Sequence, residues 1–308
     1  MYFRIHETQN PWQAGVSAKI AKGGEGTMTV DMAHLNQWLG KTETASERLA
    51  PFPSNALAAT FDRADPHYQD GSDLPPLWHW LHFLPISPLA QAGPDGHPAR
   101  GGFLPPVPLP RRMWAGSRLR FLAPLRIGET VTRVSTVTKI EHKSGRSGEL
   151  VFVTVRHDLS SGGAVSIEEE HDIVYREAAV PGAPAPAPVP VPDGAEWVRP
   201  IVPDPVLLFR YSALTFNSHR IHFDLDYVTK VEGYPGLIVH GPMIATLLLD
   251  GLRRARPEAV VKAFTFRAIA PTFHIDRFAV CGRIEGQTAR LWADKGGALT
   301  MDATAEIA

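Results

Sequence analysis

The sequence has one cysteine, no strong excess of charge and no long apolar run. Because Cys281 is the only cysteine among 308 residues, the chain cannot form an intramolecular disulfide or a cysteine-based metal cage. Its 31 basic and 32 acidic side chains give a net charge of −1, which argues against nucleic acid as the main partner. No apolar run reaches the roughly 18 residues that a membrane-spanning helix needs. These absences predict a soluble, cytoplasmic protein that binds neither nucleic acid nor a membrane.

Residues 1–27 differ from the rest of the chain, because they show no hydrophobic periodicity. They lack the apolar core of a signal peptide, and Glu7 and Glu25 are unlike an acid-poor transit peptide. We expect residues 1–27 to be a disordered segment or an extension.

A Pro/Ala-rich stretch at 178–194 divides the remaining sequence. Alternating Pro and Ala favour an extended, stiff connector. The length of the chain allows two domains. We place one at 28–177 and the other at 195–308.

Hydrophobic patterns predict similar elements on both sides of this connector. Residues 129–177 alternate with period two and indicate three antiparallel strands, while 31–49 and the aromatic run 77–84 favour helices. After the connector, an apolar helix begins at Gly241 and four strands are expected within 260–308. An antiparallel sheet wrapped around an apolar helix, twice, predicts an α+β fold of two tandem hotdog units.

Six arginines and no acid occur between Gly96 and Gly128, and the first of them lies in a Gly/Pro-rich loop at 93–110. This pattern is typical either of a solvated basic face or of a site for phosphate or carboxylate. The arginines are Arg100, Arg111, Arg112, Arg118, Arg120 and Arg126.

Most candidate catalytic residues lie between Phe209 and Gly251. Gly241 begins a helix whose first amides lack intrahelical acceptors, and glycine allows a carbonyl to approach closely. Such a site can polarise a thioester and stabilise its enolate. His222 is the natural general base, and Asn217 can orient water but cannot ionise.

Several neighbouring side chains have open roles. His219 is either a second catalytic group or a supporting one, Asp224 can hold the following turn, and His240 either orients the helix start or packs. His219, His222 and Asp224 could also be metal ligands, but no second cluster accompanies them. We therefore expect no metal.

The stretch FRYSALTFNSHRIHFDLDYVTKVEGYPGLIVHGPMIATLL resembles the motif of MaoC-like (R)-specific enoyl-CoA hydratases. That motif pairs an aspartate with a histidine five residues later and ends in a His-Gly helix start. His222 falls on the histidine and Gly241 on the oxyanion glycine. Asn217 stands at the aspartate position, and His219 replaces the usual asparagine.

This variant form resembles the subgroup of mesaconyl-C4-CoA hydratases and 3-hydroxyacyl-thioester dehydratase type 2 proteins. PPLWHWLHFLP, GHPARGGFLPPVPLPRRMWAGSRLRF and KSGRSGELVFVTVRHD resemble its first hotdog, which is like that of fatty-acid synthase dehydratases. The resemblance covers roughly 30–308. It implies that the first hotdog shapes the acyl pocket and the second is catalytic.

The resemblance also implies an acyl-CoA substrate, with CoA as part of the substrate and no other cofactor. The favoured reaction is hydration of mesaconyl-C4-CoA to citramalyl-CoA, with itaconyl-CoA or general 3-hydroxyacyl thioesters as alternatives. A hotdog thioesterase and a non-catalytic acyl-CoA binder remain open. Arg111 and Arg112 are expected to meet the substrate carboxylate or the CoA phosphates. The other expected substrate contacts are His240, Trp114 and Tyr234, and we expect a homodimer of double-hotdog chains.

Overall fold

The computed structural model describes residues 30–98, 100–145, 148–178 and 186–308. Three sequence predictions therefore lie wholly or partly outside the described residues. They are the extension at 1–27, the turn at 146–147 and the middle of the connector, 179–185.

Ten strands of the described chain form one antiparallel sheet in the order β1-β3-β4-β5-β2-β7-β10-β9-β8-β6. The strands are β1 (Thr42–Arg48), β2 (Arg111–Phe121), β3 (Thr130–Gly145), β4 (Gly148–Ser161), β5 (Ala164–Arg176), β6 (Trp197–Ile201), β7 (Val261–Ala268), β8 (Phe278–Glu285), β9 (Thr288–Lys295) and β10 (Ala298–Ile307). The predicted α+β class and the strands expected within 129–177 and 260–308 are confirmed.

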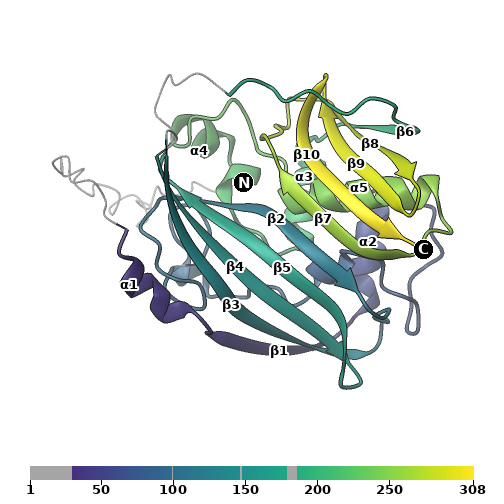
Figure 1. The fold of residues 1–308 in the computed structure, drawn as a ribbon, viewed down its shortest axis with the longest axis horizontal. Coiled ribbons are helices and arrows are strands. Elements are labelled where there is room, and N and C mark those ends of the chain that lie inside the picture. The colour runs from purple at the N-terminus through teal and green to yellow at the C-terminus, as the bar shows by residue number, and fades with distance from the viewer. Residues whose placement is uncertain (1–29, 99, 146–147, 179–185) are drawn as a thin grey trace, which may run out of the picture.

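The first five strands and the last five repeat the same internal order. β1-β3-β4-β5-β2 corresponds to β6-β8-β9-β10-β7, and the two sets meet where β2 pairs with β7. A Cβ at Gly116 would lie 2.3 Å from the Phe266 carbonyl oxygen, so this close junction requires glycine. The chain therefore forms one continuous sheet from two similar halves (Figure 1).

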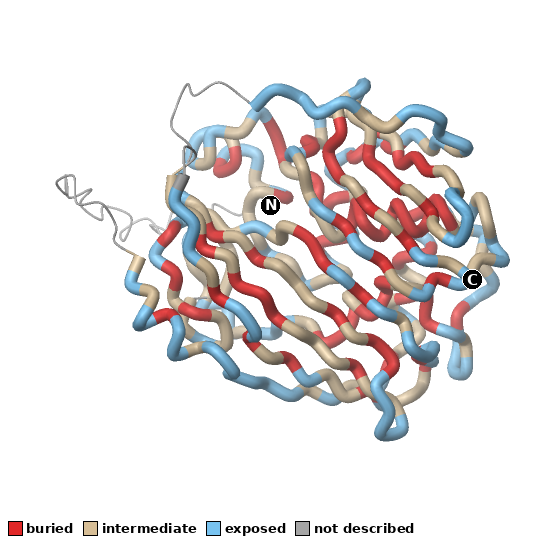
Figure 2. Tube along the Cα trace, in the orientation of Figure 1, coloured by how far each residue is buried: buried red, intermediate tan, exposed pale blue. Residues whose placement is uncertain are grey.

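The helices lie on one side of this sheet (Figure 1). The longest, α5 (Gly241–Ala255), packs against β6, β8, β9 and β10, and ten of its residues are buried. Figure 2 shows the buried segments concentrated along the strands and around α5. No described helix combines the length and apolar character needed to cross a bilayer. The others are α1 (Met32–Leu35), α2 (Pro51–Thr60), α3 (Pro205–Leu214), α4 (Leu225–Lys230) and the 3-10 turns Asn36–Trp38, Trp78–Leu81, Leu89–Gln91 and Arg220–His222.

The buried helix predicted at 77–84 is wrong. Only one 3-10 turn forms there, because Leu77 and Phe83 adopt left-handed φ values of 70° and 54° that an α-helix excludes. The run is apolar because its side chains fill the core directly; Trp78 is 2% exposed. In the first half, α2 occupies the place between β1 and β2 that α5 occupies between β6 and β7.

The helix predicted over 31–49 is also largely wrong. Only its beginning is helical, and Thr42–Arg48 instead forms the edge strand β1. Gly40, with φ of 77°, ends the helical part. The strand was hidden in the sequence because an exposed edge strand lacks alternating apolar residues.

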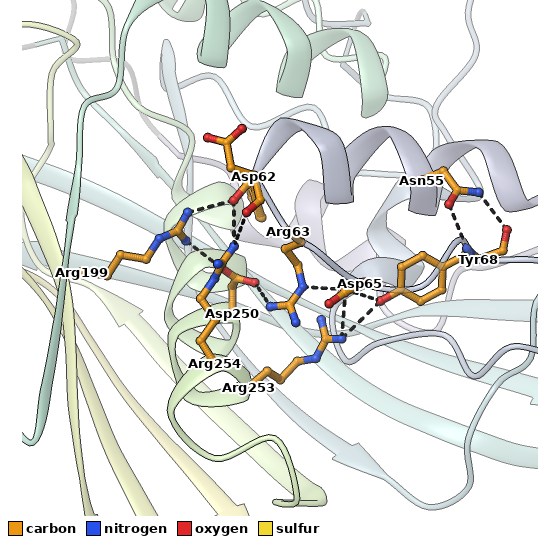
Figure 3. A network of polar contacts seen from close by, with 10 residues as sticks. Asn55, Asp62, Arg63, Asp65, Tyr68, Arg199, Asp250, Arg253 and Arg254 are labelled. Carbon is orange, nitrogen blue, oxygen red and sulfur yellow. Dashed lines mark hydrogen bonds and ion pairs between the residues drawn. The ribbon is translucent and has the colours of Figure 1, made fainter.

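A buried ion network joins the two halves (Figure 3). Asp250 of α5 is 1% exposed and accepts hydrogen bonds from Arg63, from Arg199 at 2.6 Å and from Arg254 at 2.8 Å. Arg199 and Arg254 also donate to the Phe61 carbonyl at 2.9 and 2.8 Å. One carboxylate thereby fixes α5 of the second half against the segment that follows α2 of the first.

Candidate active site

A cleft of about 2330 Å³ is lined by residues of both halves. The nine residues that the sequence predicts to be catalytic or to bind substrate all lie along this cleft. The cleft therefore brings the candidate catalytic segment and the arginine-rich strand β2 to one site. They are Arg111, Arg112, Trp114, Asn217, His219, His222, Tyr234, His240 and Gly241.

His222 ends a 3-10 turn and is 7% exposed. Its Nδ1 lies 2.7 Å from the Ile238 carbonyl oxygen, which can only accept, so Nδ1 carries the hydrogen. Nε2 therefore holds a lone pair. Burial lowers the pKa of His222 to about 4, although the bond to Ile238 opposes the change. The ring is a neutral acceptor at neutral pH, as a general base must be.

His240 stacks on His222 with ring centroids 3.7 Å apart. It is 1% exposed, and its Nε2 and the Ser212 hydroxyl share a 2.8 Å hydrogen bond. Burial and the neighbouring His222 lower its pKa, so His240 is also neutral. Its Nδ1 is buried without a partner among the described residues. His240 thus supports the His222 ring and offers one polar atom at the helix start.

Gly241 is the first residue of α5, and the His240 side chain makes no capping hydrogen bond to this helix. Its N–H has no acceptor within the described chain, and a Cβ built on Gly241 would meet no atom within 4 Å. An unused amide at the positive end of a helix, facing open space, is suited to a developing oxyanion.

Asn217 and His219 shape the turn before His222. The Asn217 Oδ1 accepts a 3.0 Å hydrogen bond from the His219 backbone N–H, so one lone pair of this oxygen holds the turn. His219 presents its ring edge to His222, with centroids 5.5 Å apart. Burial, together with His97 and His222, lowers the pKa of His219. Asp224, as expected, holds the next turn: it caps α4 through the Tyr227 N–H at 2.9 Å.

Two residues that the sequence reasoning did not select complete this region. Asp95 and His97 come from the Gly/Pro-rich loop of the first half, and Asp95 Oδ2 lies 3.2 Å from His97 Nδ1. The His97 ring lies 3.9 Å from the His219 ring. The available signal was their position in a long loop, since such loops in compact domains are often functional.

Ligand atoms of Asp95, His97 and His219 lie within 4.8 Å of one another, which is close enough to consider a metal ion. Two imidazoles and one carboxylate would suit zinc. The carboxylate, however, already accepts the His97 Nδ1–H, and the His97 and His219 rings lie against each other with centroids 3.9 Å apart and a tilt of 44°.

Five of the six clustered arginines are occupied by protein groups. Arg118, Arg120 and Arg126 pair with carboxylates on the surface, and Arg100 donates to the carbonyls of Val107, Leu109 and Pro110. Arg111 donates to the Glu232 carbonyl at 2.6 Å and to the Tyr234 hydroxyl at 3.2 Å, and its Nε lies 3.3 Å from the Glu232 carboxylate. Arg111 and Tyr234 therefore join the halves at the rim of the cleft.

Arg112 is the exception. This half-buried guanidinium has no carboxylate within ion-pair distance in the described chain. It lies opposite Tyr175 across the β2–β5 pair, and its charge lowers the pKa of His97 and of His219, after burial. The cleft thus contains an unpaired cation beside its histidines.

Two buried polar atoms lie near Arg112, the Tyr175 hydroxyl, which faces its guanidinium, and His171 Nε2, and neither makes a close hydrogen bond in the described chain. Trp114 packs on His171 with centroids 3.9 Å apart and is held by its Nε1–H bond to the Ser117 hydroxyl at 3.0 Å. Unpaired buried polar atoms are rare, so these atoms are natural contacts for a polar ligand.

Glu169 lies deeper in the first half, 3% exposed, and the groups around it satisfy its oxygens. It accepts hydrogen bonds from His79 at 3.1 Å, from Trp80 and from Ser117. Burial alone would raise the pKa of Glu169, but the His79 bond and nearby histidines lower it to about 2. His79 is therefore buried against a structural carboxylate.

Comparisons with known proteins agree with this architecture. The family model for hydroxyacyl-thioester dehydratase type 2 matches residues 77–274, more than half of the chain. The mesaconyl-C4-CoA hydratase of Chloroflexus aurantiacus is 48% identical over 88% of this chain and 96% of its own length. The mitochondrial hydroxyacyl-thioester dehydratase type 2 of Schizosaccharomyces pombe is 30% identical over 73% of this chain and 81% of its own.

Among solved structures, a MaoC-like dehydratase from Phytophthora capsici matches with a TM-score of 0.63. It is 16% identical, and the match covers 91% of this chain and 99% of the other. This likeness confirms the predicted hotdog fold. The chain belongs to the hydroxyacyl-thioester dehydratase type 2 family of MaoC-like hotdog hydro-lyases.

Proposed function

We propose that this protein is a hydratase of 2-enoyl-CoA thioesters that converts mesaconyl-C4-CoA to citramalyl-CoA. The 48% identical relative from Chloroflexus aurantiacus carries that substrate in its name. The site has the two elements that hydration of an enoyl thioester needs, a neutral base and a hydrogen-bond donor for the enolate.

In the proposed mechanism, the thioester oxygen accepts a hydrogen bond from the Gly241 N–H, which has no acceptor among the described residues. Water loses a proton to His222 Nε2 as its oxygen bonds to Cβ, and the C=C electrons move onto the thioester as an enolate. The His222 imidazolium then returns the proton to Cα. The Ile238 carbonyl keeps Nδ1 protonated, so Nε2 is the nitrogen that gains and loses the proton.

No metal or redox group enters these steps, and CoA takes part only as a portion of the substrate. Asn217 and His219 shape the turn that presents His222, and His240 supports its ring. Trp114 and Tyr234 line the cleft, and in this proposal they contact the acyl chain.

The observation that favours a dicarboxylic acyl group is Arg112. Mesaconyl-C4-CoA has a free carboxylate at the end opposite the thioester, and a half-buried guanidinium without an acid partner is a strong attractor for it. The Tyr175 hydroxyl and His171 Nε2 offer further polar contacts. Arg111 does not share this role, because Glu232 neutralises it.

Arg112→Ala tests the substrate assignment. Losing a charge-paired hydrogen bond costs about 2–5 kcal/mol, so kcat/KM for mesaconyl-C4-CoA should fall roughly 30-fold or more. The value for crotonyl-CoA, which lacks the carboxylate, should change little. Arg126→Ala, at an exposed arginine paired with Asp73, is the matched control. An equal loss with both substrates would exclude the carboxylate role.

A hotdog thioesterase is the competing activity. It needs a carboxylate base or nucleophile beside the helix start, but Asn217 cannot ionise and Asp224 is occupied by Tyr227 and Arg220. Release of free CoA from a saturated acyl-CoA would favour this alternative, and citramalyl-CoA formation would favour hydration.

We also propose the division into hotdog domains 28–177 and 195–308, which the repeated strand order supports. The sheet ends in the outer strands β1 and β6, so pairing of two chains at one of these edges is our proposal for assembly. Light scattering should then give twice the chain mass of 33.7 kDa. A single unpaired cysteine fits our proposal of the cytoplasm as the compartment.

A further inference from the structure

The proposed hydration leaves one requirement unmet within the second half. The attacking water has two hydrogens, and His222 Nε2 can accept only one of them. Asn217, which stands where the motif has an aspartate, cannot ionise, and its Oδ1 already accepts one hydrogen bond from the His219 N–H. The two nearby carboxylates of the second half have other partners, since Asp224 caps α4 and Glu232 pairs with Arg111.

The first half brings a carboxylate and an imidazole to this point. The Arg220 N–H donates to the Asp95 carbonyl at 2.9 Å, and the Ser218 hydroxyl donates to the Gly96 carbonyl at 2.6 Å. Gly96 has φ of 88°, and a Cβ there would lie 1.9 Å from the Ser218 carbonyl oxygen. Only glycine allows so close an approach, so the loop is built to lie against the catalytic turn.

The docked loop extends the row of histidines in the cleft. Ring centroids are 3.7 Å apart for His240 and His222, 5.5 Å for His222 and His219, and 3.9 Å for His219 and His97. The row ends at Asp95, which accepts the His97 Nδ1–H at 3.2 Å and the His97 backbone N–H at 3.0 Å. Since Nδ1 carries the hydrogen, the His97 Nε2 holds a lone pair.

We propose that the Asp95–His97 pair, supplied by the first half, takes the place of the motif's missing aspartate. His97 Nε2 accepts a hydrogen bond from the second O–H of the attacking water. Asp95 is a positioning residue that fixes the tautomer of His97 and balances the positive charge that develops on the histidines. This inference rests on the proposed hydration.

The step balances with His222 as the only group that changes its protonation. One O–H bond of water breaks and its proton passes to His222 Nε2, while the second hydrogen stays on the oxygen, hydrogen-bonded to His97. The oxygen bonds to Cβ and the proton on His222 returns to Cα. Both histidines and Asp95 end the turnover as they began.

The charges around His97 agree with an acceptor role. Burial lowers the pKa of His97, the hydrogen bond to Asp95 opposes this, and Arg112 and Arg100 lower it further. His97 is thus neutral at neutral pH. Burial alone would raise the pKa of Asp95, but the hydrogen bonds from His97 lower it, so the carboxylate is ionised.

His97→Ala should lower kcat about tenfold or more, because the attacking water loses a hydrogen-bond acceptor in the transition state, with little change in KM. Asp95→Asn keeps the shape and removes the charge. It should lower kcat. It should also move the acidic limb of the kcat/KM profile to lower pH, because the protonated histidines lose the stabilising negative charge of Asp95. A purely structural role would not move that limb. The double variant should be no worse than His97→Ala, since the pair acts as a unit.

Two further variants make the test specific. Gly96→Ala should undock the loop and reproduce the loss of kcat, whereas His67→Ala, at an exposed histidine, should behave like wild type. Melting temperatures of the Asp95, His97 and His67 variants should stay near that of the wild type. Wild-type kcat in His97→Ala and Asp95→Asn would overturn the proposal.

The wild-type protein is first assayed with mesaconyl-C4-CoA, itaconyl-CoA and crotonyl-CoA, and the variants with whichever is hydrated. If mesaconyl-C4-CoA alone is not hydrated, the proposed substrate is wrong, but the role of His97 can still be tested with another enoyl-CoA. Metal analysis supplies the alternative outcome. If the wild type holds one equivalent of zinc, His97→Ala holds none and chelation abolishes activity, then Asp95, His97 and His219 form a metal site. That result would overturn the proposed role of the Asp95–His97 pair.

Discussion

Gly241→Ala separates the oxyanion role of the α5 start from its role in folding. A Cβ at Gly241 would meet no protein atom within 4 Å, and its φ lies outside the left-handed region. The protein itself therefore tolerates the methyl group. Alanine at a compatible position stabilises by about 0.4–1 kcal/mol, so the free energy of unfolding should stay the same or rise.

Activity should change in the opposite direction. The methyl group would occupy the space next to the Gly241 N–H where the thioester oxygen is proposed to lie. Loss of one oxyanion donor costs about 2.7–4 kcal/mol, which corresponds to roughly a 10²–10³-fold fall in kcat. The assay follows the absorbance of the conjugated enoyl thioester during hydration, together with urea unfolding of the same preparation.

The same helix provides the control. A Cβ at Gly251 would lie 3.4 Å from Trp197 Nε1 and 3.6 Å from Val280, an ordinary contact far along α5 from the site. Gly251→Ala should therefore gain helix stability and keep its activity. Unchanged kcat in Gly241→Ala would refute the reasoning, because the space would then not hold the reacting carbonyl.

Two further predictions concern pH and the ion network. Burial lowers the pKa of His222 to about 4 from its ordinary 6.5, so the acidic limb of kcat/KM should lie near pH 4. Between pH 4 and 6.5, His222 binds fewer protons in the native state than in the unfolded state. Its contribution to the free energy of unfolding should therefore fall as the pH drops through this range, by up to about 1.4 kcal/mol per pH unit. An acidic limb of kcat/KM near pH 6.5 would contradict the lowered pKa. Asp250→Asn should cost about 3–5 kcal/mol in urea unfolding, because three arginines lose their shared anion. Asp226→Asn, at an exposed pair with Lys230, should lower the free energy of unfolding by at most about 0.5 kcal/mol. Equal losses in the two variants would show that the Asp250 network does not stabilise the contact between the halves.

The fold could be predicted where burial leaves a periodic pattern. Strands β3, β4 and β5 alternate clearly because one face is buried, and α5 is recognisable because it is apolar almost all round. The edge strand β1 was missed because both of its faces are largely exposed. Residues 77–84 were misread because an apolar run records burial, not backbone conformation, and left-handed residues such as Leu77 leave no clear sequence signal.

The residues of the candidate site also differ in whether the sequence could indicate them. Asn217, His222 and Gly241 lie within 25 residues of one another, so a local motif could indicate them together. Asp95 and His97 are more than a hundred residues away, and only the docking of their loop on Ser218 and Arg220 brings them to the catalytic turn. Likewise, Arg112 could be distinguished from the other arginines only after their partners were known.

The repeated strand order has an evolutionary consequence. If two identical hotdog chains paired in this way, every substitution would appear in both chains, on each side of the junction that β2 and β7 form here. Within one fused chain, each half can change alone. Here one half keeps the 15-residue helix α5 with its glycine start, whereas the other has only the 10-residue α2 and a long loop. A fused chain can therefore keep a helix start in one half and place a loop of the other half beside it.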